Sequence, residues 1–238
     1  MSLALIYLMR AANGPAPHAT FLSAYRQHAA GPVAYMLVLA CKGYGTAQLG
    51  EALRPWTDLQ PLVLDLPDVG LDLGSYRRAS AAISSEYVCL MNSYSRPLAP
   101  GWLRLLHAAA SRPGVGIAGA TGSLEQTPHV RTNAFCMRRS LFLETIQIEP
   151  NSKADCYTIE HGPRSITQQV RARGLAARIV NRAGQETDLA DARESRTFRW
   201  GNQDQLLVAD NQTDSYARSD RGQQLRLQRL AWGREEPR

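Results

Sequence analysis

The sequence predicts an α/β fold of three layers, in which helices cover both faces of a mostly parallel sheet. Apolar runs rich in branched and aromatic residues alternate with stretches of helical spacing along most of the chain. This alternation is typical of consecutive strand–helix units and of a parallel sheet. The chain has 238 residues, of which 44% are hydrophobic. That is enough to bury the core of one domain.

The first half of the chain contains four expected strands, each followed by an expected helix. Residues 3–9 are apolar throughout and indicate a buried strand. In the helix that follows, Phe21, Leu22 and Tyr25 share one side, and Gly31 marks the end. The expected strands are residues 3–9, 33–41, 61–66 and 87–91, and the expected helices are residues 20–30, 46–53, 75–83 and 101–110.

The second half is less regular, and its pattern loosens from residue 150. A loop rich in glycine and threonine is expected over residues 119–132, and an exposed polar segment over residues 181–196. The expected strands are residues 115–118, 134–137 and 176–181, and the expected helices are residues 164–173, 202–209 and 222–232.

The composition restricts the kind of partner. The net charge of +6 comes almost wholly from arginine, since Lys42 and Lys153 are the only lysines. Nucleic-acid-binding proteins usually gather basic residues in a stripe, whereas here arginine is scattered among Asp and Glu. The charge is therefore compatible with anionic ligands in general, and no nucleic-acid partner is expected.

Cysteine usage and the N-terminus point to an unprocessed cytoplasmic chain. The four cysteines form no CxxC pair and have no His at zinc-ligand spacing, so buried free thiols are expected. The apolar segment 2–9 has no preceding basic residue and no cleavage site after it, and it is too short to span a bilayer.

Polar residues that follow the strands are the candidate site residues, because open α/β sheets bind ligands beyond the carboxyl ends of their strands. The loop after residues 61–66 holds Asp65, Asp68 and Asp72. Ser75 is expected to cap the next helix, whose N–H groups with Arg77 and Arg78 would bind an anion. The alternative is that the aspartates only form a turn and that Arg77 is solvated.

The order of motifs over nearly the whole chain resembles a known family. The motifs are "RAANG" (10–14), "FLSAYRQHAAGP" (21–32), "KGYG" (42–45), "DVGLDLGSYRRA" (68–79), "LMNSYSRPLAPGWL" (90–103), "PGVGIAGATGS" (113–123), "HVRTNAF" (129–135), "RSITQQVRARGL" (164–175) and "ESRTFRWGNQDQLLVADNQT" (194–213). Their order resembles that of family 2-like glycosyltransferases with the A-type, nucleotide-sugar-binding fold. The resemblance is strongest to a bacterial subgroup of small cytoplasmic proteins, and polysaccharide biosynthesis is typical of such enzymes.

The resemblance implies transfer of a sugar from a nucleoside diphosphate donor to an acceptor hydroxyl. It places Arg10 and Asn13 near the nucleotide, Asp65 near the base or ribose, and Asp72 with Arg77 near the ribose and donor. It also implies a domain over residues 1–213, with a nucleotide-binding half of about 1–123 and an acceptor half of about 124–213. Residues 214–238 are then a C-terminal helical extension.

The segment "NSYS" (92–95) lies where such enzymes carry a metal-binding Asp-x-Asp. Asn92 and Tyr94 stand at the two acidic positions, and both are poor ligands for a hard cation, so Mn or Mg is in doubt. Arginines and helix N-termini can stabilise a leaving diphosphate instead. The candidate arginines are Arg77, Arg78, Arg96 and Arg131, although Arg96 has an alternative reading as a surface residue. Tyr94 either stacks on a base or sugar or closes the loop.

By similarity, Glu160 is the candidate base that takes the acceptor proton, with His161 second. The alternative is that Glu160 only enters the helix that follows. The "HVRTNAF" segment resembles an acceptor loop, which places Arg131, Thr132 and Asn133 at an acceptor pocket. A glycan, a lipid-linked molecule or a small molecule would serve as acceptor. The transfer is expected to be inverting and metal-independent, and the alternative is a catalytically degenerate relative that serves as a nucleotide-sugar-binding or scaffold protein.

The end of the chain, "RGQQLRLQRLAW" (221–232), predicts a basic amphipathic helix. Leu227, Leu230 and Ala231 share one side, with Arg226 and Arg229 beside them. Docking of this helix on the protein's own core or in a homodimer is the favoured interpretation. Peripheral contact with an inner membrane, which would suit a lipid-linked acceptor, is the alternative.

Overall fold

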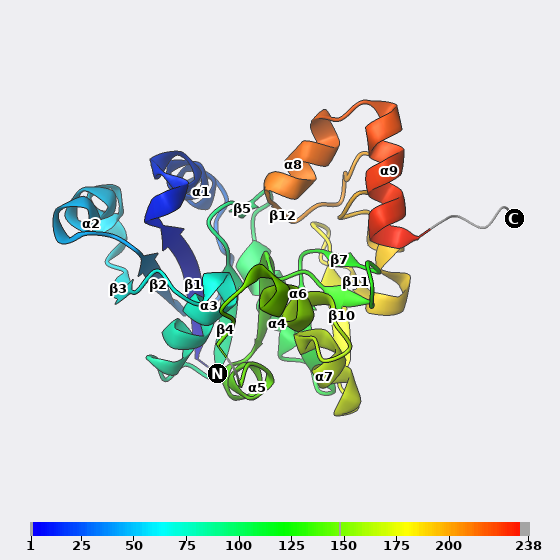
Figure 1. Ribbon diagram of the computed structural model, residues 1–238, viewed down its shortest axis with the longest axis horizontal. Helices are drawn as coiled ribbons and strands as arrows, with labels where there is room; N and C mark the ends of the chain where they lie inside the picture. Colours follow the sequence, from blue (N-terminus) through cyan, green and yellow to red (C-terminus); the bar gives the residue numbers. More distant parts are fainter. Residues whose placement is uncertain (1, 148, 234–238) are drawn as a thin grey trace, which may run out of the picture.

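The computed structural model describes residues 2–147 and 149–233 and has the three layers that the sequence predicts. The middle layer is an eight-stranded sheet in the order β11-β10-β6-β9-β4-β1-β2-β3 (Figure 1). Its strands are β1 (Leu3–Arg10), β2 (Tyr35–Lys42), β3 (Leu62–Leu66), β4 (Tyr87–Met91), β6 (Val115–Gly119), β9 (Ala134–Arg138), β10 (Ala176–Val180) and β11 (Glu186–Asp188).

Most neighbouring strands are parallel. β1 lies between β2 and β4 and pairs with both in parallel, and β2 pairs with β3 in the same way. β9 is antiparallel to both β4 and β6, and β11 is antiparallel to β10. The carboxyl ends of β1, β2, β3 and β4 therefore meet at one edge of the sheet, where a ligand site is expected.

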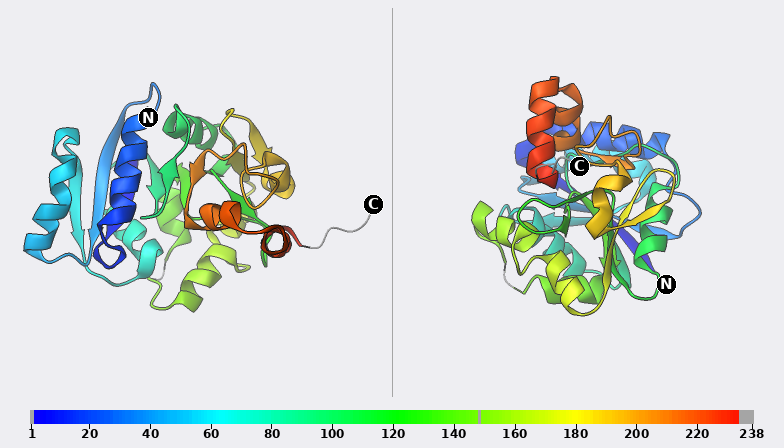
Figure 2. Two further views of the ribbon diagram at one scale, coloured as in Figure 1. Left: turned by 90° about the horizontal axis from the view of Figure 1, so that it is seen from above. Right: turned by 90° about the vertical axis from the view of Figure 1, so that its right-hand side faces the viewer.

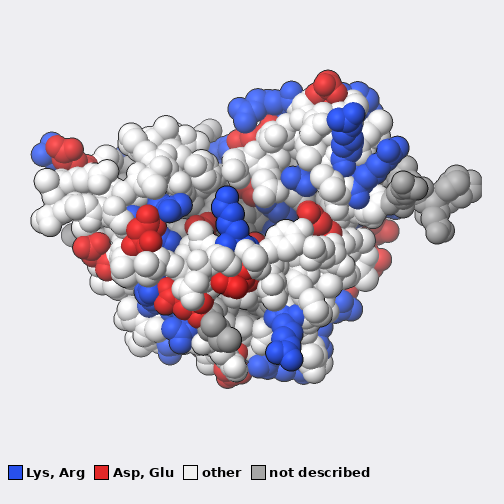
Figure 3. Space-filling view, in the orientation of Figure 1, with Lys and Arg blue, Asp and Glu red and all other residues white. Residues whose placement is uncertain are grey.

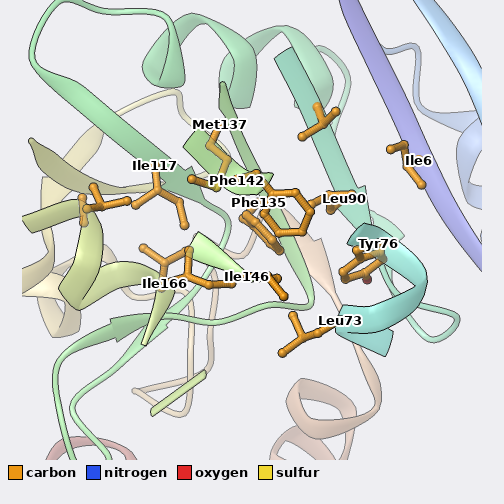
Figure 4. Packing of buried hydrophobic residues seen from close by; sticks show 14 of the residues in the cluster. Ile6, Leu73, Tyr76, Leu90, Ile117, Phe135, Met137, Phe142, Ile146 and Ile166 are labelled. Carbon is orange, nitrogen blue, oxygen red and sulfur yellow. The ribbon is translucent and has the colours of Figure 1, made fainter. Parts of the chain in front are cut away.

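Side chains of β1 alternate between the two faces of the sheet, as the pleat requires. Ala4, Ile6 and Leu8 belong to one core with α3 (Leu71–Ala81), α5 (Arg139–Thr145) and α7 (Ile166–Ala172). Leu5 and Tyr7 belong to the other core with α1 (Pro15–Gln27) and α4 (Trp102–Ala110). Figure 4 shows the first core, in which the rings of Phe135 and Phe142 have centroids 6.0 Å apart.

Small elements lie around these layers. The remaining helices are α2 (Thr46–Leu53), α6 (Lys153–His161), α8 (Asn211–Arg218) and α9 (Arg221–Trp232), with 3-10 turns η1 (Ala11–Asn13), η2 (Arg54–Leu59) and η3 (Leu189–Ser195). The remaining strands are β5 (Arg96–Pro97), β7 (Gly122–Ser123), β8 (His129–Val130) and β12 (Val208–Ala209). Within the described ranges, no helix has the length and apolar character needed to cross a membrane.

The structure corrects the predicted start of α3. The helix begins at Leu71, after Gly70, whose φ of 75° suits glycine. Asp72 therefore lies in the first turn, and Ser75 lies inside the helix, where its hydroxyl donates to the Leu71 carbonyl at 2.9 Å. The prediction that Ser75 caps this helix is wrong.

Two predictions in the second half are also wrong. Residues 202–209 form no helix and include β12. The segment 181–196, expected to be exposed, contains β11 and η3, and it buries Leu189 and Ala192. The buried thiols are confirmed, since Cys41, Cys89 and Cys136 are buried and free, while Cys156 is half-buried.

The C-terminal helices α8 and α9 stand at the outer edge of the molecule (Figure 2). The docking of α9 on the core uses its last residues: the Ala231 carbonyl accepts from the Leu124 N–H at 2.7 Å, and the Trp232 indole N–H donates to the Phe198 carbonyl at 3.0 Å. Leu230, expected on the docked side, is 56% exposed instead. The expected boundary at residue 214 falls inside α8.

Candidate active site

A polar cavity of about 580 Å³ brings together side chains from both halves of the chain. Eight of the predicted site residues line it: Asp72, Asn92, Tyr94, Arg131, Thr132, Asn133, Glu160 and His161. Figure 3 shows basic and acidic side chains next to each other around the hollow at the centre of this face. A larger cavity of about 610 Å³ lies against α1 and α2, but its lining is mostly apolar and includes none of the predicted site residues.

The loop after β4 is a tight turn organised by Asn92. Its side-chain oxygen accepts hydrogen bonds from the Tyr94 N–H at 3.1 Å and the Ser95 hydroxyl at 2.9 Å. Below it, the Ser93 hydroxyl donates to the Leu8 carbonyl at 2.9 Å, which fastens the turn to β1. The amide oxygen of Asn92 is thus already used by the turn.

This donor set is a poor fit for the metal that the family resemblance implies. A hard cation prefers carboxylate and free carbonyl oxygens. Asn92 has its oxygen occupied, and Tyr94 offers a phenol, not a carboxylate, and is 40% exposed. Among the described residues, no cluster of three His, Cys, Asp or Glu side chains has metal-binding geometry.

Next to the cavity, Asp68, in the loop after β3, joins the last residues of β1 and β2. Its carboxylate accepts from the Arg10 guanidinium at 3.1 and 3.2 Å and lies 3.6 Å from the Lys42 amine. The hydrogen bonds from Arg10 lower the pKa of Asp68 below its ordinary value. Lys42 is almost fully buried and also donates to the Leu71 carbonyl at 2.7 Å. Sequence reasoning assigned Arg10 to the nucleotide, whereas Lys42, the first residue of the "KGYG" motif, was given no role.

Asp72 faces the cavity from the first turn of α3. Burial raises the pKa of its carboxyl, while the charge of Lys42 acts in the opposite direction. Two other predicted donor residues lie away from the cavity lining: Asn13 ends η1, and Asp65 is exposed in the edge strand β3.

The four arginines expected to neutralise phosphates are all engaged within the protein. The Arg77 guanidinium donates to the Ile146 carbonyl at 2.9 Å, away from the cavity. Arg78 pairs with Glu149, Arg96 pairs with both oxygens of Asp214, and Arg131 pairs with Asp210 at 2.7 Å. Of these four, only Arg131 lines the cavity, with its guanidinium carbon 3.9 Å from the centre of the Phe198 ring.

Arg199 is a cavity residue that sequence reasoning missed. One of its terminal nitrogens donates to the side-chain oxygen of Gln212 at 3.0 Å, and its Nε is buried without a hydrogen-bond partner. No carboxylate among the described residues lies within ion-pair distance of it. Burial and the charge of Arg131 lower its pKa, but guanidinium remains protonated in proteins. Its position between Phe198 and Trp200 is the only sequence signal, since aromatic neighbours suggest a semi-buried arginine.

Glu160 lies in the last turn of α6 and faces the cavity. The Thr132 hydroxyl donates to one carboxylate oxygen, and His161 Nε2 lies 3.7 Å from the other. Burial favours a raised pKa for Glu160, but the nearby His161 ring and the hydrogen bond from Thr132 prevail and lower the pKa below its ordinary value. Because α7 has its own cap, Ser165, the alternative role of Glu160 as the entry residue of that helix is wrong.

Two rings hold His161 in place. Tyr157 stacks on it with centroids 4.5 Å apart, and the ring of His129 lies 4.2 Å away. His129 Nδ1 donates to the Thr127 carbonyl at 2.8 Å. Burial and the neighbouring His161 lower the pKa of His129 to about 4, so its ring is neutral at neutral pH. The cavity therefore contains an ionised carboxylate held by a hydroxyl and an imidazole, and an arginine without a carboxylate partner.

Comparison with solved structures supports the fold. The mannosyltransferase PcManGT of Pyrobaculum calidifontis, solved with GDP-Man and Mn2+, matches with a TM-score of 0.58 and 13% identity. The match covers 83% of this chain and 59% of that one. The apo form of the glycosyltransferase GlyE of Streptococcus pneumoniae matches with a TM-score of 0.50 and 9% identity, over 74% of this chain and 45% of that one.

These similarities show that the chain has the A-type glycosyltransferase fold. The chain spans less than two thirds of the length of either neighbour. No protein-family model matches the sequence, and no curated protein sequence matches it.

Proposed function

We propose that the protein is a glycosyltransferase that moves a sugar from a nucleoside diphosphate to an acceptor hydroxyl, with inversion and without a metal. One observation carries the proposal: the same cavity holds the ionised carboxylate of Glu160 and the guanidinium of Arg199, which has no carboxylate within ion-pair distance among the described residues. A direct displacement needs a base for the acceptor proton and a positive charge for the leaving diphosphate. The fold shared with PcManGT, which binds GDP-Man, supports the donor class.

In the proposed reaction, Glu160 removes the proton of the acceptor hydroxyl as that oxygen attacks the anomeric carbon. The bond from that carbon to the diphosphate oxygen breaks, and its electron pair leaves with the nucleoside diphosphate. Attack from the side opposite the leaving group inverts the anomeric centre. Thr132 orients the Glu160 carboxylate, and His161 stabilises its charge before proton transfer. Arg199 stabilises the negative charge that grows on the diphosphate.

The donor nucleoside is proposed to lie over the carboxyl ends of β1, β2 and β3. The family resemblance assigns four residues near these strand ends to the donor nucleoside: Arg10, Asn13, Asp65 and Asp72. Arg77 is left out of this proposal because its guanidinium is bonded to the Ile146 carbonyl. Arg131, Thr132 and Asn133 lie on the acceptor side, where a glycan, a lipid-linked molecule or a small molecule is accepted.

A degenerate, binding-only protein is the second candidate. The observation that favours it is the turn of residues 92–95, in which Asn92 uses its side-chain oxygen to hold the loop. This protein would bind a nucleotide sugar at the same cavity but transfer nothing. Both candidates predict nucleotide binding, so turnover decides between them.

The test begins with calorimetric titration of a panel of nucleoside diphosphates, with manganese and with EDTA. We expect one nucleotide to bind equally well under both conditions. The donor that matches this nucleotide is then used in turnover assays, where Glu160→Gln is expected to lower kcat about 10²–10⁴-fold with unchanged nucleotide affinity. Absence of binding to every nucleotide overturns the proposal, and binding without turnover in the unmodified protein favours the degenerate relative.

A second variant tests the metal-free mechanism. Arg199→Ala is expected to lower kcat about 10²–10³-fold, as removal of a group that stabilises transition-state charge does. Arg193→Ala is the matched control, since Arg193 also stacks on an aromatic ring, that of Trp200 at 4.6 Å, but lies outside the cavity lining. Equal activity of the two variants would show that Arg199 does not contribute to catalysis.

A further inference from the structure

The outer face of α9 is not used by the fold. The helix docks through Ala231 and Trp232, which are buried, whereas Leu225 and Leu230 are 38% and 56% exposed. Arg226 and Arg229 are exposed on the same outer face, between the two leucines in the helical projection. The sequence alone allowed two interpretations of this helix, docking on the core and contact with a membrane. The exposed leucines and arginines show that a face of the helix stays free after it has docked.

The charge of this region is strongly one-sided. Arg218, Arg221, Arg226 and Arg229 are exposed on α8 and α9, and none of the four has a carboxylate within ion-pair distance among the described residues. The acidic side chains of these helices are already used, because Asp214 pairs with Arg96 and Asp220 caps α9. Figure 3 shows basic side chains gathered over the part of the surface where α8 and α9 lie.

The outer face of α9 also continues into the candidate active site. Leu230 is both the most exposed large apolar residue of the described chain and part of the cavity lining. Gln212 of α8, also exposed, lines the same cavity and accepts from Arg199. A surface that covers α9 would therefore lie at the mouth of the cavity.

We propose that α9 docks the protein on an anionic lipid bilayer. Leu225 and Leu230 enter the head-group layer, and Arg226 and Arg229 meet the lipid phosphates, which is how basic amphipathic helices bind such surfaces. Four exposed arginines, which have no acidic partner among the described residues, complement the negative charge of an anionic bilayer. We therefore take such a bilayer as the binding partner. The consequence, which rests on the proposed function, is that the acceptor is carried by the lipid and reaches Glu160 from the membrane surface.

Sedimentation with vesicles tests the docking without any nucleotide. We expect the full chain to bind vesicles that contain phosphatidylglycerol, to bind phosphatidylcholine vesicles weakly, and to dissociate at high salt. The double variant Arg226→Glu with Arg229→Glu is expected to lose at least about tenfold in affinity. The matched control, Arg54→Glu with Arg171→Glu, reverses two exposed arginines elsewhere that have no ion-pair partner in the described part of the chain, and it should bind as the unmodified protein does.

The apolar contribution has its own pair of variants. Leu225→Ser with Leu230→Ser is expected to weaken vesicle binding, whereas Val69→Ser, at another exposed apolar position, should leave it unchanged. Equal binding of the α9 variants and their controls overturns the proposal. Tighter binding to double-stranded DNA than to anionic vesicles would also overturn the proposal. A dimer detected by light scattering that is absent in the α9 variants would overturn it as well.

The placement of the cavity mouth is tested by fluorescence quenching. A fluorophore attached to Gln212→Cys should be quenched by lipids that carry nitroxide head groups, and one on Glu144→Cys of α5, on the opposite side of the molecule in Figure 1, should not. Equal quenching at both positions overturns the proposed orientation. Because none of these experiments uses nucleotide, failure of the unmodified protein to bind anionic vesicles, in a preparation that does bind nucleotide, refutes the docking alone and leaves the proposed function standing.

Discussion

At the scale of single residues, Arg131 shows how a predicted ligand residue can also be part of the structure. Its guanidinium is 2.7 Å from Asp210 and lies over the ring of Phe198. Asp210 is almost fully buried, and its other oxygen accepts from the Gln212 and Thr213 N–H groups at the start of α8. The pair therefore connects the cavity wall to the first turn of α8.

Arg131→Met is expected to reduce the free energy of unfolding by about 3–5 kcal/mol, because it leaves the Asp210 charge buried without its partner. The measurement is urea denaturation at neutral pH. The control is Arg178→Met, which breaks the 2.9 Å pair with Asp188 at the surface. Its two side chains are 32% and 46% exposed and thus reached by solvent, so the loss of this pair should cost less than about 1 kcal/mol. Equal costs for the two variants would contradict the structural role of Arg131.

His129 gives the cavity a pH-dependent stability. Its pKa falls from 6.5 to about 4 in the folded protein, mainly through burial and next through His161, with Arg131 in the same direction and Glu160 opposing it. Between these two values the unfolded chain binds a proton that the folded chain does not bind. Stability is therefore lost as the pH falls from about 6.5 to about 4, by about 3 kcal/mol in total.

The variant His129→Asn removes this titration. We expect the loss of unfolding free energy between neutral pH and pH about 4.5 to be smaller in the variant than in the unmodified protein. Acid-titrating carboxylates are common to both proteins, so the difference between the two pH profiles isolates the histidine. Parallel profiles would show that His129 keeps an ordinary pKa in the folded state.

At the scale of elements, the sequence predicts most strands of the sheet because they are apolar runs, whereas the polar edge strand β11 gives no such signal and was not predicted. β1 and β4 have the expected bounds to within one residue. Helix starts are harder: α3 begins four residues early because Gly70 and Leu71 both adopt positive φ, which no periodicity reveals. α6 was missed because it buries no residue completely and so carries no apolar stripe.

The site residues show the same contrast: those with a local sequence signal were predicted, and those placed by long-range contacts were not. Asp72 and Asn92 were found because they follow strands, where an α/β sheet places its ligand residues. Arg199 was missed because residues 196–207 have no regular structure, and only long-range contacts bring that arginine beside residues 131 and 212. The partners of the other arginines, such as Asp210 and Asp214, are likewise distant in the sequence.

Since α6 buries no residue completely, the stability of this helix is expected to depend mainly on its N-terminal cap. The Ser152 hydroxyl accepts from the Asp155 N–H at 3.1 Å, and the Asp155 carboxylate accepts from the Ser152 N–H at 2.9 Å. Ser152→Ala is expected to destabilise the helix by about 1 kcal/mol, which speeds amide hydrogen exchange in α6 and lowers kcat without changing nucleotide affinity. Thr158→Ala, an exposed position within the same helix, is the control. Unchanged exchange in Ser152→Ala would show that packing alone holds α6.

At the scale of the whole molecule, the cavity joins parts of the chain that are far apart. Its lining runs from Asp72 in the first turn of α3, through Asn92 just after β4, to Leu230 in the last helix. α9 closes one side of it, with the Ala231 carbonyl accepting from the Leu124 N–H and the Trp232 indole N–H donating to the Phe198 carbonyl. A ligand that fills this cavity therefore raises the free energy of unfolding of the whole folded chain, and not only of one part of it.

Nucleotide binding is accordingly expected to raise the melting temperature of the entire protein in a single transition. At a free concentration of about 100 times Kd, a ligand adds about 2.7 kcal/mol to the unfolding free energy. For a domain of this size that corresponds to a shift of about 5–10 °C. Differential scanning calorimetry should show this shift for the matching nucleoside diphosphate, with the same size in EDTA and in manganese. Arg199→Ala should reduce the shift, whereas Arg193→Ala should keep it. A shift that appears only with manganese would mean that a cation and not Arg199 neutralises the diphosphate, and it would return Asn92 and Tyr94 to the role of metal site.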